Sequence, residues 1–404
     1  MLDSVAIVTT SAPAPLDSKR GSHRSEGMAV LALAMSGFVL NLNANVMGAL
    51  MPVLGPKFKF QEDGEAMLLA AAGAGSALGA LLVADAGRWL GRRSLLGVSL
   101  SIFVLTSAAH LLVGSYEALL AARAMSGFSI GLAYATASAA AADLAPYERR
   151  AAVMGKFNAG LFLAIPVGMP VTVLLASMEL WKLTFALQAA VGGLALVLSL
   201  RQLPSLPPTG AGRRLALLKI PGVVAVLLAT MLHVGSFFTV IQLATSWLDR
   251  EGIVVKRDQV WVWVGLGVLS VVGSAFFGKL ADRVGKQRFV LFTSGVLVCC
   301  FFTLSRRWGM DYLLPVSCLL ALAAAARTGP QQALVSGMVP AEQLGALMGL
   351  RGFCMQLGVA VFAVAAALAP QAMGFQDILL MGAACQAGSY LAIRIGVKEP
   401  LMRS

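Results

Sequence analysis

Residues 278–288 read Gly278-Lys-Leu-Ala-Asp-Arg-Val-Gly-Lys-Gln-Arg288, and an apolar segment lies on each side of them. A short charged turn between two segments of membrane-spanning length predicts a hairpin that joins two transmembrane helices. In this hairpin Gly278 permits the close approach of a neighbouring helix, and Gly285 supplies a turn residue without a Cβ atom. The carboxylate of Asp282 can accept hydrogen bonds from the N-terminus of an adjacent helix. We expect Arg283, Lys286 and Arg288 to hold the hairpin at cytoplasmic headgroups.

The composition predicts a helical protein that crosses a membrane many times. Of the 404 residues, 58% are hydrophobic and 12% are charged, against roughly 25% charged residues in soluble domains. Apolar runs of about 20 residues, long enough to cross a bilayer, recur along the chain. The net charge of +12 is therefore typical of basic cytoplasmic loops and does not indicate a nucleic-acid partner.

Twelve membrane spans are expected. They cover Met28–Leu54, Glu65–Ala86, Ser94–Val113, Glu117–Ala142, Ala151–Ser177, Trp181–Leu200, Val223–Leu248, Val260–Lys279, Phe289–Leu304, Tyr312–Met338, Leu344–Leu368 and Ile378–Ile395. The Pro- and Gly-rich stretch after the sixth span marks the boundary between two halves. The expected organisation is a disordered cytoplasmic tail (1–27), an N-terminal six-helix half (28–201), a linker (202–219), a C-terminal six-helix half (220–398) and a second tail (399–404). Lys and Arg are concentrated on the side of the N-terminus, which predicts that both termini are cytoplasmic.

The two halves carry an internal repeat. A shift of 194 residues places Pro146-Tyr-Glu148 on Pro340-Ala-Glu342, and it places Ala152-Val-Met-Gly155 on Ala346-Leu-Met-Gly349. Duplicated halves predict a binding site at their interface, near the middle of the bilayer. The same shift puts Arg88 at the position of Asp282, so the first copy of the hairpin lacks the carboxylate.

The pattern G-x-L-A-D-R-x-G-K-x-R at residues 278–288 resembles the signature loop of the major facilitator superfamily. The resemblance implies an all-α fold of twelve transmembrane helices in two pseudo-symmetric halves, with spans 1, 4, 7 and 10 lining a central cavity. Arg123, followed by Gly127 and Gly131, resembles the helix-4 motif that this superfamily links to proton coupling. The run from Gly160 to Pro170 partly matches an antiporter motif and suggests the drug/proton-antiporter-like branch, although Ile165 replaces an expected glycine.

Ionisable residues inside the predicted spans are almost all basic. They are Arg123, Lys156, Arg327 and Arg351, together with His110 and His233, whereas no acidic residue lies deep in any span. Because a charge inside a bilayer is costly, such residues are candidates for function. A cavity lined by cations without internal counter-ions favours a substrate with an anionic group.

We therefore predict a substrate site formed by Arg327, Arg123, Asn41, Asn45, Gln331, His233, Arg351 and Lys156. His233 and Arg123 are the candidates for proton coupling, and Gly278, Asp282, Arg283, Gly285, Lys286 and Arg88 form the predicted gating loop. Several alternatives stay open at this point. Lys156 and Arg351 can snorkel to the membrane surface, Arg123 can bind a backbone carbonyl, and the asparagines can join helices to one another.

The expected function is secondary active transport of a small organic anion, or of an amphipathic molecule with an acidic group, across the inner membrane. Proton-coupled export by a monomer in the lipid bilayer is expected, with a broad multidrug pump, an uptake permease and a non-transporting receptor or assembly factor as alternatives. The sequence has no nucleophile-elbow, zinc-protease or phosphate-loop motif, so we expect no enzyme activity. The five cysteines lie in apolar runs without metal-ligand spacing, and we expect neither a metal nor a cofactor.

Overall fold

A computed structural model describes residues 19–59, 64–205, 214–250, 256–306, 310–367 and 374–397. The helices of the first half are α1 (Lys19–Phe58), α2 (Gly64–Ala86), α3 (Arg92–Ala109), α4 (Tyr116–Asp143), α5 (Arg150–Leu163), α6 (Met169–Ser177) and α7 (Trp181–Gln202). A 3₁₀ turn, η1 (Tyr147–Arg149), precedes α5, and a π-helical segment, η2 (Ala164–Gly168), joins α5 to α6 in one span. After the short α8 (Arg214–Leu217), the second half comprises α9 (Val223–Arg250), α10 (Lys256–Val284), α11 (Lys286–Leu304), α12 (Met310–Ser336), α13 (Ala341–Ala367) and α14 (Phe375–Gly396).

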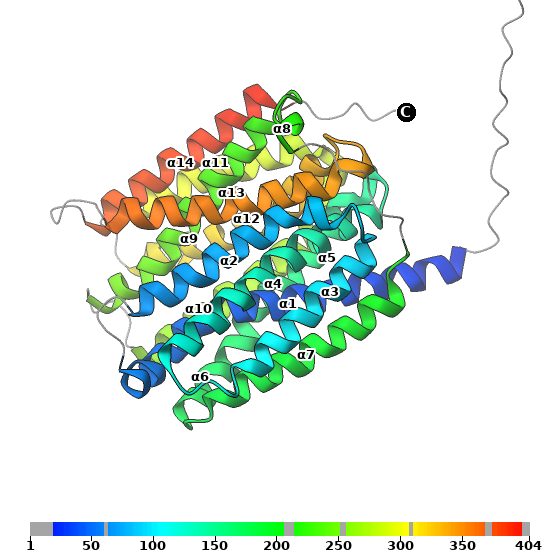
Figure 1. The fold of residues 1–404 in the computed structure, drawn as a ribbon. Helices are drawn as coiled ribbons and strands as arrows, with labels where there is room; N and C mark the ends of the chain where they lie inside the picture. Colours follow the sequence, from blue (N-terminus) through cyan, green and yellow to red (C-terminus); the bar gives the residue numbers. More distant parts are fainter. Residues whose placement is uncertain are drawn as a thin grey trace, which may run out of the picture.

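The prediction of twelve spans in two six-helix halves is confirmed. Eleven helical segments among the described residues are long and apolar enough to cross a membrane, and α3, which begins with Arg92 and Arg93, completes the twelve by packing against α4 and α7. Figure 1 shows the helices running side by side in a single bundle. The structure places the start of α1 at Lys19, so the boundary expected at residue 27 falls inside this helix. Residues 1–18 of the predicted N-terminal tail, and the whole predicted tail 399–404, lie outside the described residues.

The two halves meet mainly along two equivalent helix pairs, and α5 with α12 and α4 with α13 add further contacts. α2 packs against α13, and α5 packs against α10. Gly349 of α13 lies against the carbonyl oxygen of Ala80 in α2, and Gly155 of α5 lies against that of Ser274 in α10. Since the 194-residue shift relates Gly155 to Gly349 and Ala80 to Ser274, the two contacts are equivalent. We call this interface between the halves the seam.

Among the described residues, apolar packing joins the halves at one end of the bundle only. We call the end that carries the α10–α11 hairpin the inner end. There a continuous cluster of buried side chains includes Phe157 of α5, Ala281 of α10 and Leu347 of α13. At the outer end each half has its own cluster, around Trp181 in the first half and around Phe301 in the second. This conformation is therefore closed at the inner end.

Glycines allow α2 and α4 to pack backbone against backbone. Gly127 of α4 lies against the carbonyl group of Ala72, and Gly131 lies against that of Ser76. An added Cβ atom at either position would overlap the neighbouring backbone. Backbone atoms, unlike a flexible side chain, cannot move aside. Helix association in lipid depends on this kind of close contact between small residues.

We predict that Gly131→Ala lowers the stability of the protein. Overpacking typically costs about 1–3 kcal/mol, whereas alanine recovers at most about 1 kcal/mol of helix propensity. The midpoint of thermal unfolding in detergent should therefore fall. Gly73→Ala on α2 is the matched control, because an added Cβ at Gly73 meets nothing within 4 Å. Equal melting temperatures for the two variants would contradict the prediction.

Candidate functional site at the seam and around the buried arginines

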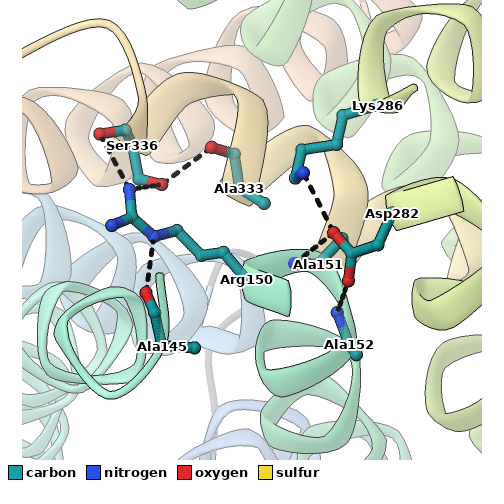
Figure 2. Close-up of polar contacts among 8 residues, drawn as sticks. All are labelled: Ala145, Arg150, Ala151, Ala152, Asp282, Lys286, Ala333 and Ser336. Atoms are coloured by element: carbon teal, nitrogen blue, oxygen red, sulfur yellow. Dashed lines mark hydrogen bonds and ion pairs between the residues drawn. The ribbon is translucent and has the colours of Figure 1, made fainter. Parts of the chain in front are cut away.

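Asp282 of α10 joins the halves at the inner end. Its carboxylate accepts hydrogen bonds from the backbone N–H groups of Ala151 (3.2 Å) and Ala152 (2.9 Å) in the first turn of α5, as Figure 2 shows. These N–H groups have no partner within their own helix, and the helix N-terminus carries partial positive charge. The bonding expected of Asp282 is thus present, and it crosses the seam.

The other hairpin residues support this contact. The Nζ atom of Lys286 lies 3.0 Å from the Asp282 carboxylate and 4.0 Å from the ring centre of Tyr147 in the other half. Gly278 lies against the backbone of Ala151 and Ala152, and Gly285 has a φ of 97°, which favours glycine. Arg283 is exposed on the same hairpin.

The equivalent contact in the first half is made differently. Arg88 occupies the position of Asp282 and pairs at the surface with Asp85, at 3.6 Å. Arg92, which the repeat relates to Lys286, crosses the seam, and its Nη2 donates a hydrogen bond to the carbonyl oxygen of Ala341 at the start of α13. Asp143 of α4 forms an ion pair with Arg92 at 2.5 Å. On this side of the seam a cation therefore binds a backbone carbonyl, whereas on the other side a carboxylate binds backbone N–H groups.

Further polar contacts cross the seam, one also at the inner end and others deeper in the bundle. Arg150 donates to the hydroxyl (3.1 Å) and the carbonyl (3.4 Å) of Ser336 on α12, visible in Figure 2. Closer to the middle, Gln332 of α12 donates to the Tyr134 hydroxyl at 2.8 Å. The amide of Asn158 on α5 donates to Gln332 at 2.6 Å. We call Gln332, Tyr134 and Asn158 the amide layer.

Arg123 of α4 is fully buried against α1. Its Nη1 donates to the side-chain oxygen of Asn43 at 2.8 Å and to the Asn43 carbonyl at 3.3 Å. Asn43 in turn donates to the side chain of Gln188 on α7 at 2.7 Å. The Nε and Nη2 groups of Arg123 have no acceptor among the described residues. Arg123 thus binds a backbone carbonyl, as one of the predicted alternatives has it, but its closer acceptor is the side-chain amide of Asn43.

Arg327 of α12 is also fully buried, and it points into the second half. Its Nη2 donates to the Ser389 hydroxyl at 2.8 Å, and its Nη1 donates to the side-chain oxygen of Gln386 at 3.3 Å, both on α14. The same Gln386 oxygen lies 2.9 Å from Nδ1 of His233 on α9. Because Gln386 uses its amide nitrogen to donate to Ser236 and to the His233 carbonyl, its oxygen accepts, and the proton of the neutral His233 ring lies on Nδ1.

Arg351 of α13 has 3% of its surface exposed. We call Arg123, Arg327 and Arg351 the three buried arginines, as distinct from Arg92, which is buried at the seam. The Nε group of Arg351 has no acceptor among the described residues, and its positive charge is close enough to act on both Arg327 and His233. No ion pair among the described residues joins Arg123, Arg327 or Arg351 to a carboxylate. The second half therefore holds a group of cations without a counter-ion in its described part.

The remaining predicted site residues are distributed differently. Asn41 donates to the Leu161 carbonyl at 2.8 Å and so joins α1 to α5. Asn45 donates to the Asn41 carbonyl at 2.8 Å and so joins two turns of α1. Gln331 donates to Thr230 of α9 at 3.2 Å. Lys156 is exposed on the face of α5 that also exposes Leu163. The structure does not bring Lys156 together with the buried arginines.

Five amide side chains at these sites were absent from the sequence-based prediction. They are Asn43, Gln188, Asn158, Gln332 and Gln386, which hold the arginines or form the amide layer. Amides inside apolar spans were the available signal, since each must find a hydrogen-bonding partner in lipid. Among the residues that the structure describes, no three His, Cys, Asp or Glu side chains gather where they could hold a metal ion.

The chain is similar to known membrane transporters. It is 26% identical over 70% of its length, and 72% of the relative's, to a Mannheimia succiniciproducens protein named "Probable sugar efflux transporter". It is 28% identical to the inner membrane transport protein YdhP of Escherichia coli K12, over 63% of this chain and 66% of the relative. The fold matches the crystal structure of the human organic anion transporter MFSD10 (TETRAN) with a TM-score of 0.75 and 17% identity, over 92% of this chain and 99% of that one.

The family model described as Major Facilitator Superfamily matches residues 33–363. This match covers most of the chain and includes both hairpins, the seam and the three buried arginines. With twelve spans in two equivalent halves, the chain belongs to the major facilitator superfamily and is a membrane transporter, not an enzyme.

Proposed function

We propose that this transporter exports a small organic anion from the cytoplasm, across the inner membrane, in exchange for protons. The observation that carries the proposal is the group formed by Arg327, Arg351 and His233, which has no carboxylate partner among the described residues. A buried cation without a counter-ion is costly, and two that act on each other add repulsion. A substrate carboxylate or phosphate that entered from the seam would relieve both costs.

Arg351 is the member of this group best placed for first contact. It belongs to α13, which packs against α2 across the seam, whereas Arg327 is held on the far side by Gln386 and Ser389. Its Nε is an unused donor. We propose that Arg351 binds the anionic group and that Arg327 contributes through its charge and through Gln386. Arg123 is proposed to play a supporting role from the first half.

The seam supports movement by alternating access. The contacts of Asp282 and Arg92 close the inner end, and both depend on pairs that a rigid rotation of one half would separate. Both residues sit on the hairpin that precedes the third helix of their half. We propose that breaking these two contacts opens the inner end to the cytoplasm, with both termini on that side.

A second candidate substrate is a sugar or another polyol. The amide layer presents uncharged donors and acceptors at the seam, which suits hydroxyl groups, and one relative is named as a sugar efflux transporter. Counterflow in proteoliposomes distinguishes the candidates. Exchange driven by carboxylates or phosphate esters, but not by neutral sugars of equal size, supports the anion, and the reverse preference supports the sugar. The absence of counterflow with either class would favour the receptor alternative.

For the substrate site, we predict opposite effects of Arg351→Gln on stability and on transport. Removing an unpaired buried charge should stabilise the substrate-free protein by about 1–3 kcal/mol. Losing a charge-assisted contact of about 1.5–3 kcal/mol should lower kcat/KM for an anionic substrate by ten- to a hundredfold. Thermal unfolding and counterflow of the same preparation measure the two effects. Arg201→Gln, at an exposed position on α7, is the charge-matched control. A parallel fall in stability and transport would assign Arg351 a structural role instead.

For proton coupling, we predict that His233→Asn abolishes proton-driven accumulation of substrate but preserves substrate exchange. The Asn amide nitrogen can replace Nδ1 as donor to Gln386, so the hydrogen-bond network is preserved while the titratable group is lost. Substrate counterflow without a pH gradient should persist, and accumulation driven by a pH gradient should disappear. If the variant still accumulates substrate under a pH gradient, His233 is not the proton carrier.

For the gate, we predict that Asp282→Asn shifts the protein towards a state open at the inner end. Asp282 accepts two bonds, from Ala151 and Ala152, each worth roughly 1.5–3 kcal/mol because the acceptor is charged. Asn can accept only one of them, without the charge, because its amide nitrogen is a donor. Spin labels at the exposed residues Arg201 of α7 and Arg288 of α11, in a background without reactive cysteines, would report longer distances. Lys279→Gln, on the same hairpin but exposed, should leave the distances unchanged. Unchanged distances in Asp282→Asn would exclude Asp282 as a latch.

A further inference from the structure

An apolar groove runs along the outside of the second half, away from the seam. Its volume is about 560 Å³, and it lies between α11, α12 and α14. The lining includes Leu291, Phe292 and Val296 of α11, Val316 and Leu319 of α12, and Tyr390 of α14. Phe292 is 70% exposed, so this surface faces the surroundings of the bundle.

Two exposed arginines stand at the inner end of the groove. Arg288 precedes Leu291 and Phe292 by one turn of α11 and therefore shares their face. Arg394 follows Tyr390 by one turn of α14, and its Nη1 lies 3.5 Å from the Tyr390 hydroxyl. Both side chains are exposed, and neither has an ion-pair partner among the described residues.

The neighbouring residues bring these two arginines to the same place. Gln287, beside Arg288, donates to the carbonyl of Val397 at 2.6 Å and to that of Ile393 at 3.4 Å. Ile393 precedes Arg394 in the chain. The inner ends of α11 and α14 are thereby fixed side by side, with one arginine on each.

The length of the groove matches one membrane leaflet. From Leu291 to Thr303 the axis of α11 rises roughly 18 Å, and half of a bilayer's hydrocarbon core is roughly 15 Å. A site with cationic groups at the headgroup level and an apolar channel of leaflet depth fits an anionic lipid.

We propose that this groove binds a phospholipid with an anionic headgroup, taken from the leaflet at the inner end. Arg288 and Arg394 bind the phosphate, the Tyr390 hydroxyl adds a hydrogen bond, and one acyl chain lies along α11 beside Gly295 and Val296. The site is distinct from the seam and from the three buried arginines, and it does not depend on the proposed substrate.

Native mass spectrometry of the purified full-length protein, titrated with phosphatidylglycerol or with phosphatidylcholine, tests the proposal. Wild-type protein should retain one phosphatidylglycerol molecule in preference to phosphatidylcholine. The double variant Arg288→Gln, Arg394→Gln should bind phosphatidylglycerol roughly thirtyfold more weakly, because each basic group contributes roughly fivefold to attraction towards anionic lipid. Arg201→Gln, which removes an exposed cation from the inner end of α7, should bind as wild type does.

A second variant tests the acyl channel without changing charge. An added Cβ at Gly295 meets nothing within 4 Å, so Gly295→Leu should fill the groove without disturbing the helix packing. Gly193→Leu on α7, equally open, is its control. Weaker phosphatidylglycerol binding in Gly295→Leu but not in Gly193→Leu supports the site. Equal binding of the two lipids by wild type, or losses that Arg201→Gln and Gly193→Leu reproduce, would overturn it.

Discussion

The arrangement of the two halves depends on one carboxylate that caps a helix of the opposite half. The first N–H groups of α5 lack partners in their own helix, and Ala151 is fully buried at the seam, where water does not reach it. Asp282 supplies both acceptors from α10, and Lys286 balances its charge. The same bonds that satisfy a helix end therefore also hold the seam shut, so the closure of the inner end and the integrity of α5 are linked.

The duplicated fold does not repeat this solution in its first half. There the position of Asp282 is occupied by Arg88, and the N-terminus of α13 receives a cation at a carbonyl instead of a carboxylate at its N–H groups. Arg92 and its equivalent, Lys286, nevertheless reach equivalent positions across the seam, Ala341 and Tyr147. The two contacts at the inner end thus lie at equivalent positions, but one depends on a carboxylate and the other on a cation, so they differ in strength. A charge-assisted pair of bonds to a helix N-terminus, favoured by the helix dipole, is stronger than one bond from Arg92, whose charge already serves Asp143.

The fold could be predicted from the sequence because each span is specified locally. Apolar length, the charged hairpin at 278–288 and the 194-residue repeat all depend on neighbouring residues or on one constant shift. The partners of the buried polar groups could not be predicted in the same way. Gln331 and Gln332 are adjacent in the sequence, yet Gln331 bonds within its own half and Gln332 crosses the seam. Asn43, and not Asn41 or Asn45, holds Arg123. The rotation of each helix about its axis in the bundle decides which face meets which neighbour. The residues next to a position in the sequence do not determine that rotation.

Neutral amides hold the buried arginines, and this choice has an electrostatic consequence. In each half a glutamine of the sixth span belongs to the arginine network, Gln188 through Asn43 and Gln386 directly. An amide satisfies individual N–H groups but leaves the net charge in place, whereas a carboxylate would cancel it. Arginines kept only for packing would be more stable with a carboxylate partner, or replaced by an apolar residue. We therefore propose that the positions where the charge is buried, partly satisfied and not neutralised are the ones that attract an incoming anion.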